Sequence, residues 1–239
     1  MGLSRAQMVT LLLALTAGCS LIQPADMEIN PGLLEYESGE KPQIYQYLEN
    51  GELSIVRISP EAESSLTAPA FGEIVEIAIR NNTNRSLRFR IDCGTILRSP
   101  NNKVVDLILS RSLEGETSAG GVWVGKAEVF SLQMKRLCPT KSVAYEIGTL
   151  AKGDLRRFSD CFCFYRPKPP ESGEKYDLTP VQYAFWRITE GVTLRQMLDY
   201  VKQKSTEEEY EQSKKQAQEH GQYTDLLLSE CKITAKFLD

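Results

Sequence analysis

The sequence predicts an α+β fold, in which an antiparallel β-sandwich is followed by a helical C-terminal region. Two observations predict this division. Between residues 73 and 147, short segments with alternating apolar residues follow one another closely, and no helical period separates them. From residue 179 onward, apolar residues recur instead at the three- and four-residue intervals of a helix. Close spacing of short strands is typical of a sandwich, for which an immunoglobulin-like topology is one candidate.

The first β signal lies in residues 44–58. Asn50-Gly51 separates two runs rich in β-forming residues, and this pair best meets the positive φ angles of a type I′ turn. We therefore expect a β-hairpin there. Further strands are expected at 73–79, 87–91, 95–99, 103–109, 122–134 and 142–147. Residues 148–177 are expected to be irregular, and the prolines in 167–170 to end the β domain.

Three helices are expected in the C-terminal region. Thr179 can cap the first, Pro180 suits its first position, and Gly191 is expected to end it. Thr193 and Gln196 have the spacing of a capping box at the start of the second. A similar pair, Ser205 and Glu208, precedes a polar helix that Gly221 is expected to end, and 224–238 supply a last apolar segment.

The amino terminus carries an apolar run. Residues 8–17 hold no charge and are preceded by Arg5, which is the charge pattern of a secretory signal peptide. A membrane span needs roughly 20 apolar residues, so the run is too short to cross a bilayer comfortably. Residues 20–43 contain prolines and glycines among polar residues and are expected to form a tether.

The end of this run, Leu15-Thr16-Ala17-Gly18-Cys19, resembles the lipobox of bacterial lipoproteins. The resemblance implies cleavage after Gly18, a diacylglyceryl thioether on Cys19, and acylation, commonly with palmitate, of the new amino terminus. Ser20 in place of Asp implies export to the outer membrane, where the organism has one. The alternative is an ordinary secretory signal, after which Cys19 would form a disulfide. The predicted organisation is a signal peptide at 1–18, a membrane tether at 19–43, a β-sandwich domain at 44–170 and a helical region at 171–239.

The composition is that of an ordinary globular protein. The chain has 239 residues, 41% of them hydrophobic and 25% charged, with a formal net charge of −4. Nucleic acid is not expected as a partner, because nucleic-acid-binding domains are usually basic. No second long apolar run is present, so only the amino terminus is expected to contact a membrane.

The six cysteines would leave an odd number if Cys19 carries lipid. Those remaining are Cys93, Cys138, Cys161, Cys163 and Cys231. At least one of them must then be free, buried or joined to another chain. Because disulfide geometry is restrictive, Cys161 and Cys163 are not expected to pair with each other. We expect a Cys93–Cys138 bond, and a bond from either Cys161 or Cys163 to Cys231.

No catalytic, metal or cofactor site is predicted. His220 is the single histidine and lies in a polar run, where a surface position is expected. The spacing of Cys161 and Cys163 is too short for a structural zinc site, and the chain has no phosphate loop, dinucleotide fingerprint or HExxH motif.

The segment PVQYAFW at 180–186 resembles the glutamine motif of thioester-forming adhesion domains. In that family a glutamine side chain condenses with a cysteine thiol. The resemblance implies that Gln182 would be the acyl partner, with Cys161 or Cys163 as the thiol. The alternative is a core-packing helix with Trp186 at its edge.

Together these observations predict a lipid-anchored extracytoplasmic protein with a binding or structural role. We expect an accessory subunit of a cell-envelope or surface assembly, whose partners are the membrane, through the lipid, and other envelope proteins. The alternatives are a thioester-forming surface adhesin and an envelope enzyme whose active site the sequence does not reveal.

Overall fold

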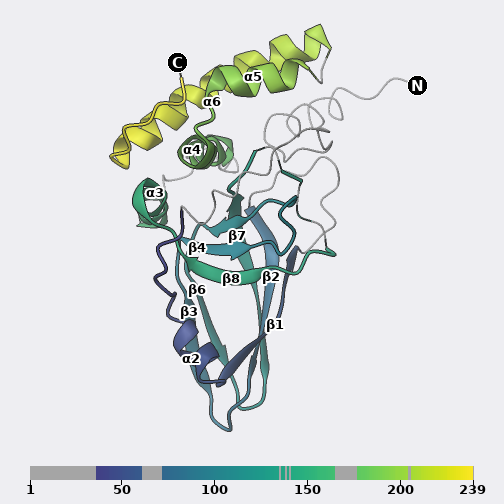
Figure 1. Cartoon of the computed structure of the whole chain (residues 1–239), viewed down its shortest axis with the longest axis vertical. Coiled ribbons are helices and arrows are strands. Elements are labelled where there is room, and N and C mark those ends of the chain that lie inside the picture. The colour runs from purple at the N-terminus through teal and green to yellow at the C-terminus, as the bar shows by residue number, and fades with distance from the viewer. Residues whose placement is uncertain are drawn as a thin grey trace, which may run out of the picture.

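The computed structural model describes residues 36–60, 72–134, 136–137, 139, 141–164, 177–203 and 206–238. Several predicted features lie outside these ranges, namely the lipobox with Cys19, most of the tether, Cys138, the prolines of 167–170 and Ser205. In the described part, the helices α3 to α6 gather at one end of the molecule, and the long strands extend to turns at the other end (Figure 1).

The main sheet has six antiparallel strands and curls into a half-barrel (Figure 1). Its strand order is β1 (Leu53–Pro60), β2 (Gly72–Asn81), β7 (Val122–Ser131), β5 (Leu107–Leu109), β4 (Thr95–Arg98) and β8 (Glu146–Leu150). A separate pair, β3 (Leu87–Ile91) and β6 (Leu113–Thr117), forms a small second sheet. The α+β class and the antiparallel pairing agree with the sequence prediction. The fold departs from a sandwich of two comparable sheets, because six of the eight strands found in the described ranges join one curved sheet.

The apolar alternation of the strands directs their side chains into a shared core. Val75, Ile77 and Ile79 of β2 are fully buried, and they pack in one cluster with Leu87 and Phe89 of β3. On β3 the intervening Arg88 is exposed. The small sheet therefore covers part of the large one, as the period-two pattern predicts for half-buried strands.

The predicted hairpin at 44–58 is wrong: only its second strand forms, and that strand pairs with β2. Residues Tyr45–Glu49 form a short helix, α2, and the strand begins only at Leu53. Asn50 stays in the right-handed helical region and caps α2, while Gly51 takes a φ of +70°. The glycine thus supplies a left-handed residue at a helix end, a use of Asn-Gly that local sequence does not separate from a hairpin turn.

The expectation of irregular structure at 148–177 is also wrong in part. Residues Gly153–Phe164 form helix α3, which buries Leu155, Phe158 and Phe162. These residues recur at helical spacing, so the sequence does carry a signal for this helix. Strand β6 is absent from the sequence prediction, and β8 begins and ends a few residues later than expected.

The C-terminal helices are α4 (Thr179–Glu190), α5 (Leu194–Lys202) and α6 (Glu207–Glu230). Gly191 ends α4 with a φ of +66°, as predicted. The capping box is confirmed: the Thr193 N–H donates to Gln196 Oε1 at 3.0 Å, and the Gln196 N–H donates to Thr193 Oγ1 at 3.3 Å.

Gly221 does not end its helix, because α6 continues to Glu230. A Cβ atom at this glycine would lie 2.7 Å from Leu238 Cδ2. The missing side chain therefore lets the last residues of the chain pack across α6, which is a tertiary reason for the glycine. None of the helices in the described ranges is long and apolar enough to cross a membrane.

Candidate functional site

The helical region meets the β region where α4 packs on β7. Gln182 is fully buried there, and its amide makes two hydrogen bonds with the backbone of Ser131. The Ser131 N–H donates to Gln182 Oε1 at 3.0 Å, and Gln182 Nε2 donates to the Ser131 carbonyl at 2.8 Å. Trp186 Nε1 donates to Ser131 Oγ at 3.1 Å. Gln182 thus completes the hydrogen bonding at the end of a strand, and Trp186 is buried rather than at the helix edge.

This arrangement bears on the thioester expectation. Both amide atoms of Gln182 are occupied by Ser131, and Cys161 forms a disulfide with Cys231. A thioester between Gln182 and Cys161 would require both interactions to be given up, and one between Gln182 and the free Cys163 would require the two Gln182–Ser131 hydrogen bonds to be given up. The geometry therefore favours the packing role of this helix.

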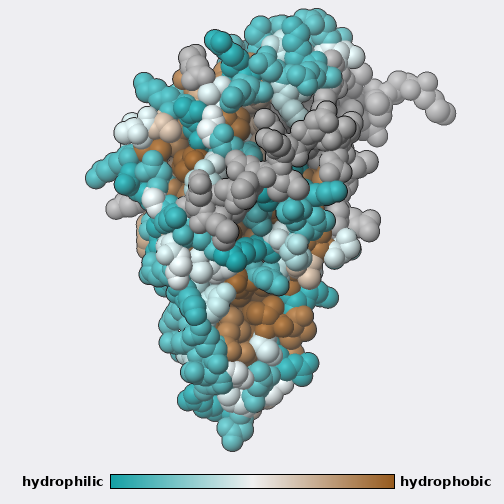
Figure 2. Space-filling view, in the orientation of Figure 1, coloured by the Kyte–Doolittle hydropathy of each residue, from teal (hydrophilic) through white to brown (hydrophobic). Residues whose placement is uncertain are grey.

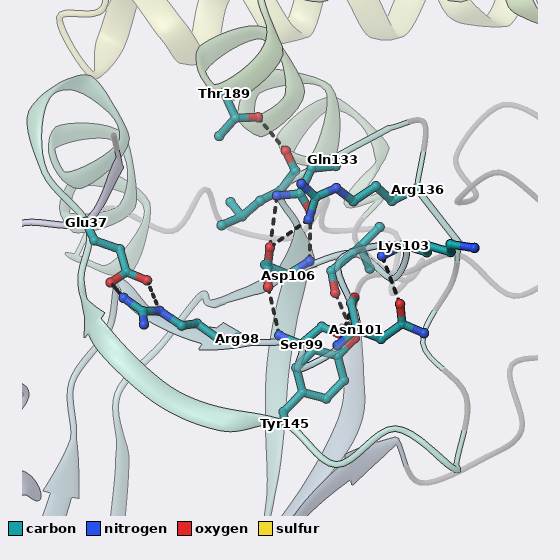
Figure 3. Close-up of polar contacts among 12 residues, drawn as sticks. Glu37, Arg98, Ser99, Asn101, Lys103, Asp106, Gln133, Arg136, Tyr145 and Thr189 are labelled. Atoms are coloured by element: carbon teal, nitrogen blue, oxygen red, sulfur yellow. Dashed lines mark hydrogen bonds and ion pairs between the residues drawn. The ribbon is translucent and has the colours of Figure 1, made fainter. Parts of the chain in front are cut away.

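A buried carboxylate, Asp106, lies near this junction (Figure 3). It accepts hydrogen bonds from the Ser99 N–H at 2.7 Å, from Arg136 Nη1 at 3.1 Å and from Gln133 Nε2 at 3.3 Å. Its own N–H donates to Gln133 Oε1 at 2.7 Å. Figure 3 shows these groups converging on Asp106 from the β4–β5 turn and from the segment after β7.

The electrostatics of Asp106 reflect this position. Burial raises the pKa of the Asp106 carboxyl, and the Ser99 N–H and the Arg136 guanidinium oppose that rise. A raised pKa is common at catalytic acids, but ion pairs inside structural networks have the same effect. The contacts of Asp106 are with its own chain and join two segments that the sequence separates. We interpret it as a cross-link between them.

A small cavity of about 230 Å³ lies between α5 and α6. It is lined by Leu194, Arg195, Leu198, Asp199 and Tyr210. Binding sites for small molecules usually measure roughly 300–1,000 Å³. In the ranges that the structure describes, no group of three or more His, Cys, Asp and Glu side chains is placed to hold a metal ion.

His220 is less exposed than the sequence suggests. Its side chain is 14% exposed, and its Nε2 lies 2.8 Å from Asp177 Oδ2. Burial of Asp177 tends to raise its pKa, but hydrogen bonds from His220 and Thr179 outweigh this and lower the pKa to about 2. The pair joins α6 to the segment before α4, because Asp177 Oδ1 also accepts the Thr179 N–H at 2.9 Å. The predicted cap by Thr179 is wrong, because Thr179 is already helical and the N-cap position is Leu178, whose side chain makes no cap bond.

Helix α3 carries two cysteines, Cys161 and Cys163, and two cysteines from other segments, Cys231 and Cys93, lie against the same helix. Cys161 is bonded to Cys231 with a Cα–Cα distance of 5.6 Å, which confirms one of the two partners expected for Cys231. The predicted Cys93–Cys138 bond is wrong, because Cys93 carries a free, buried thiol. Its Sγ lies 3.5 Å from the Ser159 carbonyl oxygen and 3.7 Å from Ser159 Oγ, both on α3. Sequence reasoning missed this neighbourhood because it did not predict the helix.

Cys163 is the second free thiol, and it is partly exposed. The Cys93 thiol is the neighbour that affects its ionisation most. The Cys93 S–H and the Ser112 N–H stabilise the Cys163 thiolate against the cost of burial, and the pKa of Cys163 falls to about 6. The same contact and burial raise the pKa of Cys93.

Three exposed valines lie on the outer face of the main sheet. Val56, Val122 and Val124 are 52%, 46% and 56% exposed. Trp123 packs edge-on against Phe89 of the core at 5.2 Å, so Val122 and Val124 on either side of it point away from the core. Ala78 of β2 pairs with both Val124 of β7 and Arg57 of β1, the residue after Val56, so the valines lie on the two strands that flank β2. We call Val56, Val122 and Val124 the valine face.

The two ends of the molecule differ in surface hydropathy. Apolar surface is visible over the lower, β part of the molecule, whereas the helical end is mostly hydrophilic on the side in view (Figure 2). Comparisons of the chain with protein-family models, with curated proteins and with solved structures find no match.

Proposed function

We propose that this chain is a lipid-anchored extracytoplasmic protein that binds another protein of the cell envelope through its β region. The anchor is the lipid predicted on Cys19. The observation that supports this function best is that the side from which the lipid would be attached and the valine face lie at opposite ends of the domain. Tyr36, the described residue nearest in sequence to Cys19, lies at the helical end, whereas the valine face lies on strands that run to the opposite end.

The entry point is given by Tyr36, the first residue described. Its hydroxyl donates to the Thr189 carbonyl in the last turn of α4, and its carbonyl accepts the Lys152 N–H at 2.8 Å, just before α3. Residues 37–40 then run beside β8. The 17 residues from Cys19 to Tyr36 span at most about 60 Å when fully extended. A lipid on Cys19 would therefore keep Tyr36, at the helical end, within that distance of the membrane, and the β end lies on the far side of the domain from this attachment.

The Cys161–Cys231 disulfide supports an extracytoplasmic location. Structural disulfides persist in oxidising compartments and are rare in the cytosol. An exported chain with a signal peptide reaches such a compartment.

The valine face has the composition of a protein-binding surface. Exposed apolar side chains that adjoin one another, surrounded by charged groups, are typical of interaction sites. Arg57 lies beside Val56 on β1, and its ion-pair partner Glu76 and the exposed Arg80 lie on β2, between the strands that carry the valines. The partner expected from this chemistry is an envelope protein with an apolar surface of its own.

The anchor is tested by Cys19→Ser in the native host. We expect the variant to lose the lipid mass and to leave the membrane fraction after a high-salt wash. Unchanged mass and membrane attachment would disprove the anchor and leave the binding surface to be judged by the next experiment.

The binding surface is tested by placing a photo-crosslinking amino acid at position 124 in one variant and at position 226 in a second. Leu226 is a matched control, because it is 50% exposed but lies on α6 at the helical end. We expect one discrete adduct from position 124, absent from position 226. The same partner should be lost on purification of Val122→Ser/Val124→Ser and kept with Leu226→Ser. Equal adducts from both positions, or a partner retained by the double variant, would reject the surface.

A further inference from the structure

We propose that Cys93 and Cys163 form a thiol–disulfide exchange site, at which an oxidised dithiol protein closes them into a second disulfide. This inference goes beyond the proposed function and depends neither on the lipid nor on the valine face.

The positions of the two thiols carry the proposal. Ser159 and Cys163 are four residues apart on α3, so their side chains lie on one face of the helix. The Cys93 sulfur contacts both Ser159 oxygens on this face, at 3.5 and 3.7 Å. Cys163 lies one turn further along the same face, and the ionisation of its thiol is linked to that of the Cys93 thiol. Two cysteine sulfurs from segments 70 residues apart in sequence are therefore neighbours.

Helix geometry separates this pair from the existing disulfide. Residues two apart in an α-helix point about 200° away from each other. Cys161 faces the end of α6 and bonds Cys231, whereas Cys163 faces the loop that follows β3. Each cysteine of the Cys161-Phe162-Cys163 segment thus has its own partner, and neither needs to exchange with the other.

The two thiols differ in ways that suit successive steps. Cys163 is partly exposed, so an oxidant can reach it, and the fall of its pKa to about 6 keeps it largely ionised at neutral pH. Cys93 is buried beneath it and protonated, since its pKa is raised. The attacking thiol in such exchanges is the accessible thiolate, and the buried thiol resolves the intermediate.

The exchange is balanced in thiols and disulfides. The Cys163 thiolate attacks one sulfur of the oxidant's disulfide, which forms a mixed disulfide and releases the second sulfur as a thiolate. Cys93 then loses its proton to that thiolate or to solvent and attacks the Cys163 sulfur. The Cys93–Cys163 bond forms, the mixed disulfide breaks, and the oxidant leaves as a dithiol that has gained two electrons and two protons.

The first test maps the disulfides of the full-length protein extracted from its native membrane, with free thiols blocked at lysis. We expect a Cys93–Cys163 linked peptide beside the Cys161–Cys231 one. Where the native protein is found reduced, incubation with oxidised glutathione should produce that linked peptide with a mass loss of about 2 Da. Two thiols that stay free after this incubation, or a bond from either of them to Cys138, would overturn the proposal.

The second test assigns the two steps by variants. With oxidised glutathione, Cys93→Ala should accumulate a stable glutathione adduct on Cys163, whereas Cys163→Ala should acquire none at Cys93. At about pH 6.5, alkylation of Cys163 should be about fivefold slower in Cys93→Ala, because the S–H donor to its thiolate is lost. Cys138→Ala is the matched control and should behave as the wild type. Preferential glutathione addition to Cys93 would reject the assigned order even if a variant folds poorly.

Discussion

The two ends of the molecule are stabilised by different means. The β end has a continuous apolar core in which residues from the two sheets, such as Ile77, Ile79 and Phe89, are almost completely buried. The helical end packs through two smaller apolar clusters, one of which also takes residues from β4, β5 and β7, and it has specific links: the Cys161–Cys231 bond, the Gln182–Ser131 pair and the Asp177–His220 contact. Burial of apolar area is spread over many residues, whereas a covalent or polar link depends on one or two.

Because of this difference, substitutions at the two ends should destabilise different parts of the protein. A helix such as α6 presents polar residues along much of its 24-residue length, so its own propensity and its apolar contacts hold it less firmly than a core strand is held. We therefore expect single substitutions at the links to loosen the helical end alone, and substitutions in the β core to destabilise the whole domain.

The largest effect is expected from removing the disulfide. Replacing Cys161 and Cys231 together by alanine opens a loop with a sequence separation of 70 residues, which should lower the free energy of unfolding by about 4 kcal/mol. Urea unfolding followed by circular dichroism measures this loss. Hydrogen exchange should show faster exchange in α3 and α6 and little change in β2 and β7. An equal increase in all four elements would contradict the comparison.

A cavity in the β core should have a slightly smaller effect that is spread more widely. Ile77→Ala removes a fully buried side chain from the centre of β2 and should cost about 3 kcal/mol. Because the core is continuous, both far-UV and tryptophan-fluorescence transitions should shift together. Arg80→Ala on the exposed side of the same strand is the control, and a shift of similar size in that variant would argue against a core effect.

Loss of the Gln182–Ser131 hydrogen bonds, which join α4 to the end of β7, should have a smaller effect on stability. Gln182→Leu keeps a similar volume but leaves the Ser131 N–H and carbonyl without their partner, which should cost about 2 kcal/mol. Gln182→Glu retains the acceptor and loses the donor, so it should cost a comparable amount at neutral pH. Intact-mass analysis after methylamine treatment should show no mass change in the wild type, because Gln182 is used for packing. A methylamine adduct on Gln182 would instead restore the thioester interpretation.

The smallest effect is expected at the Asp177–His220 pair. The folded pKa of Asp177, about 2, lies below its ordinary value of 3.8. Its contribution to stability is therefore present above about pH 4 and is lost as the pH falls toward about 2. Asp177→Asn should flatten the pH dependence of unfolding in that window. The gain is modest because the Asp177 side chain is 51% exposed and screened by solvent. An unchanged acid dependence in the variant would remove the link.

The pKa of Asp106 is shifted in the opposite direction from that of Asp177. Burial raises its folded pKa, so its protonated form is favoured in the native state. The stability that this provides is present below the unfolded pKa and is lost as the pH rises through the folded one. The two carboxylates thus act with opposite signs, which a comparison of single Asn variants across about pH 2 to 7 can separate.

Local features of the structure could be predicted where neighbouring residues alone determine them. The alternation of β2 and β3, the glycine that ends α4 and the capping box of α5 depend on side chains within a few positions of one another. The predictions failed where the same local pattern serves two structures. Asn50-Gly51 suits both a hairpin turn and a helix end. A glycine such as Gly221 suits both a helix end and a point inside a helix where another segment of the chain packs closely across it.

By itself, the sequence determined the α+β class, the antiparallel strands, the end of α4, the start of α5 and the signal that predicts the lipid on Cys19, because periodicity and short motifs depend on adjacent residues. Only the tertiary structure decided that six strands share one curled sheet, that Gln182 pairs with a strand end, and that Cys93 lies beside Cys163. Such pairings join residues many positions apart. They depend on which faces pack together, and that is settled by the burial of the whole chain rather than by any local segment.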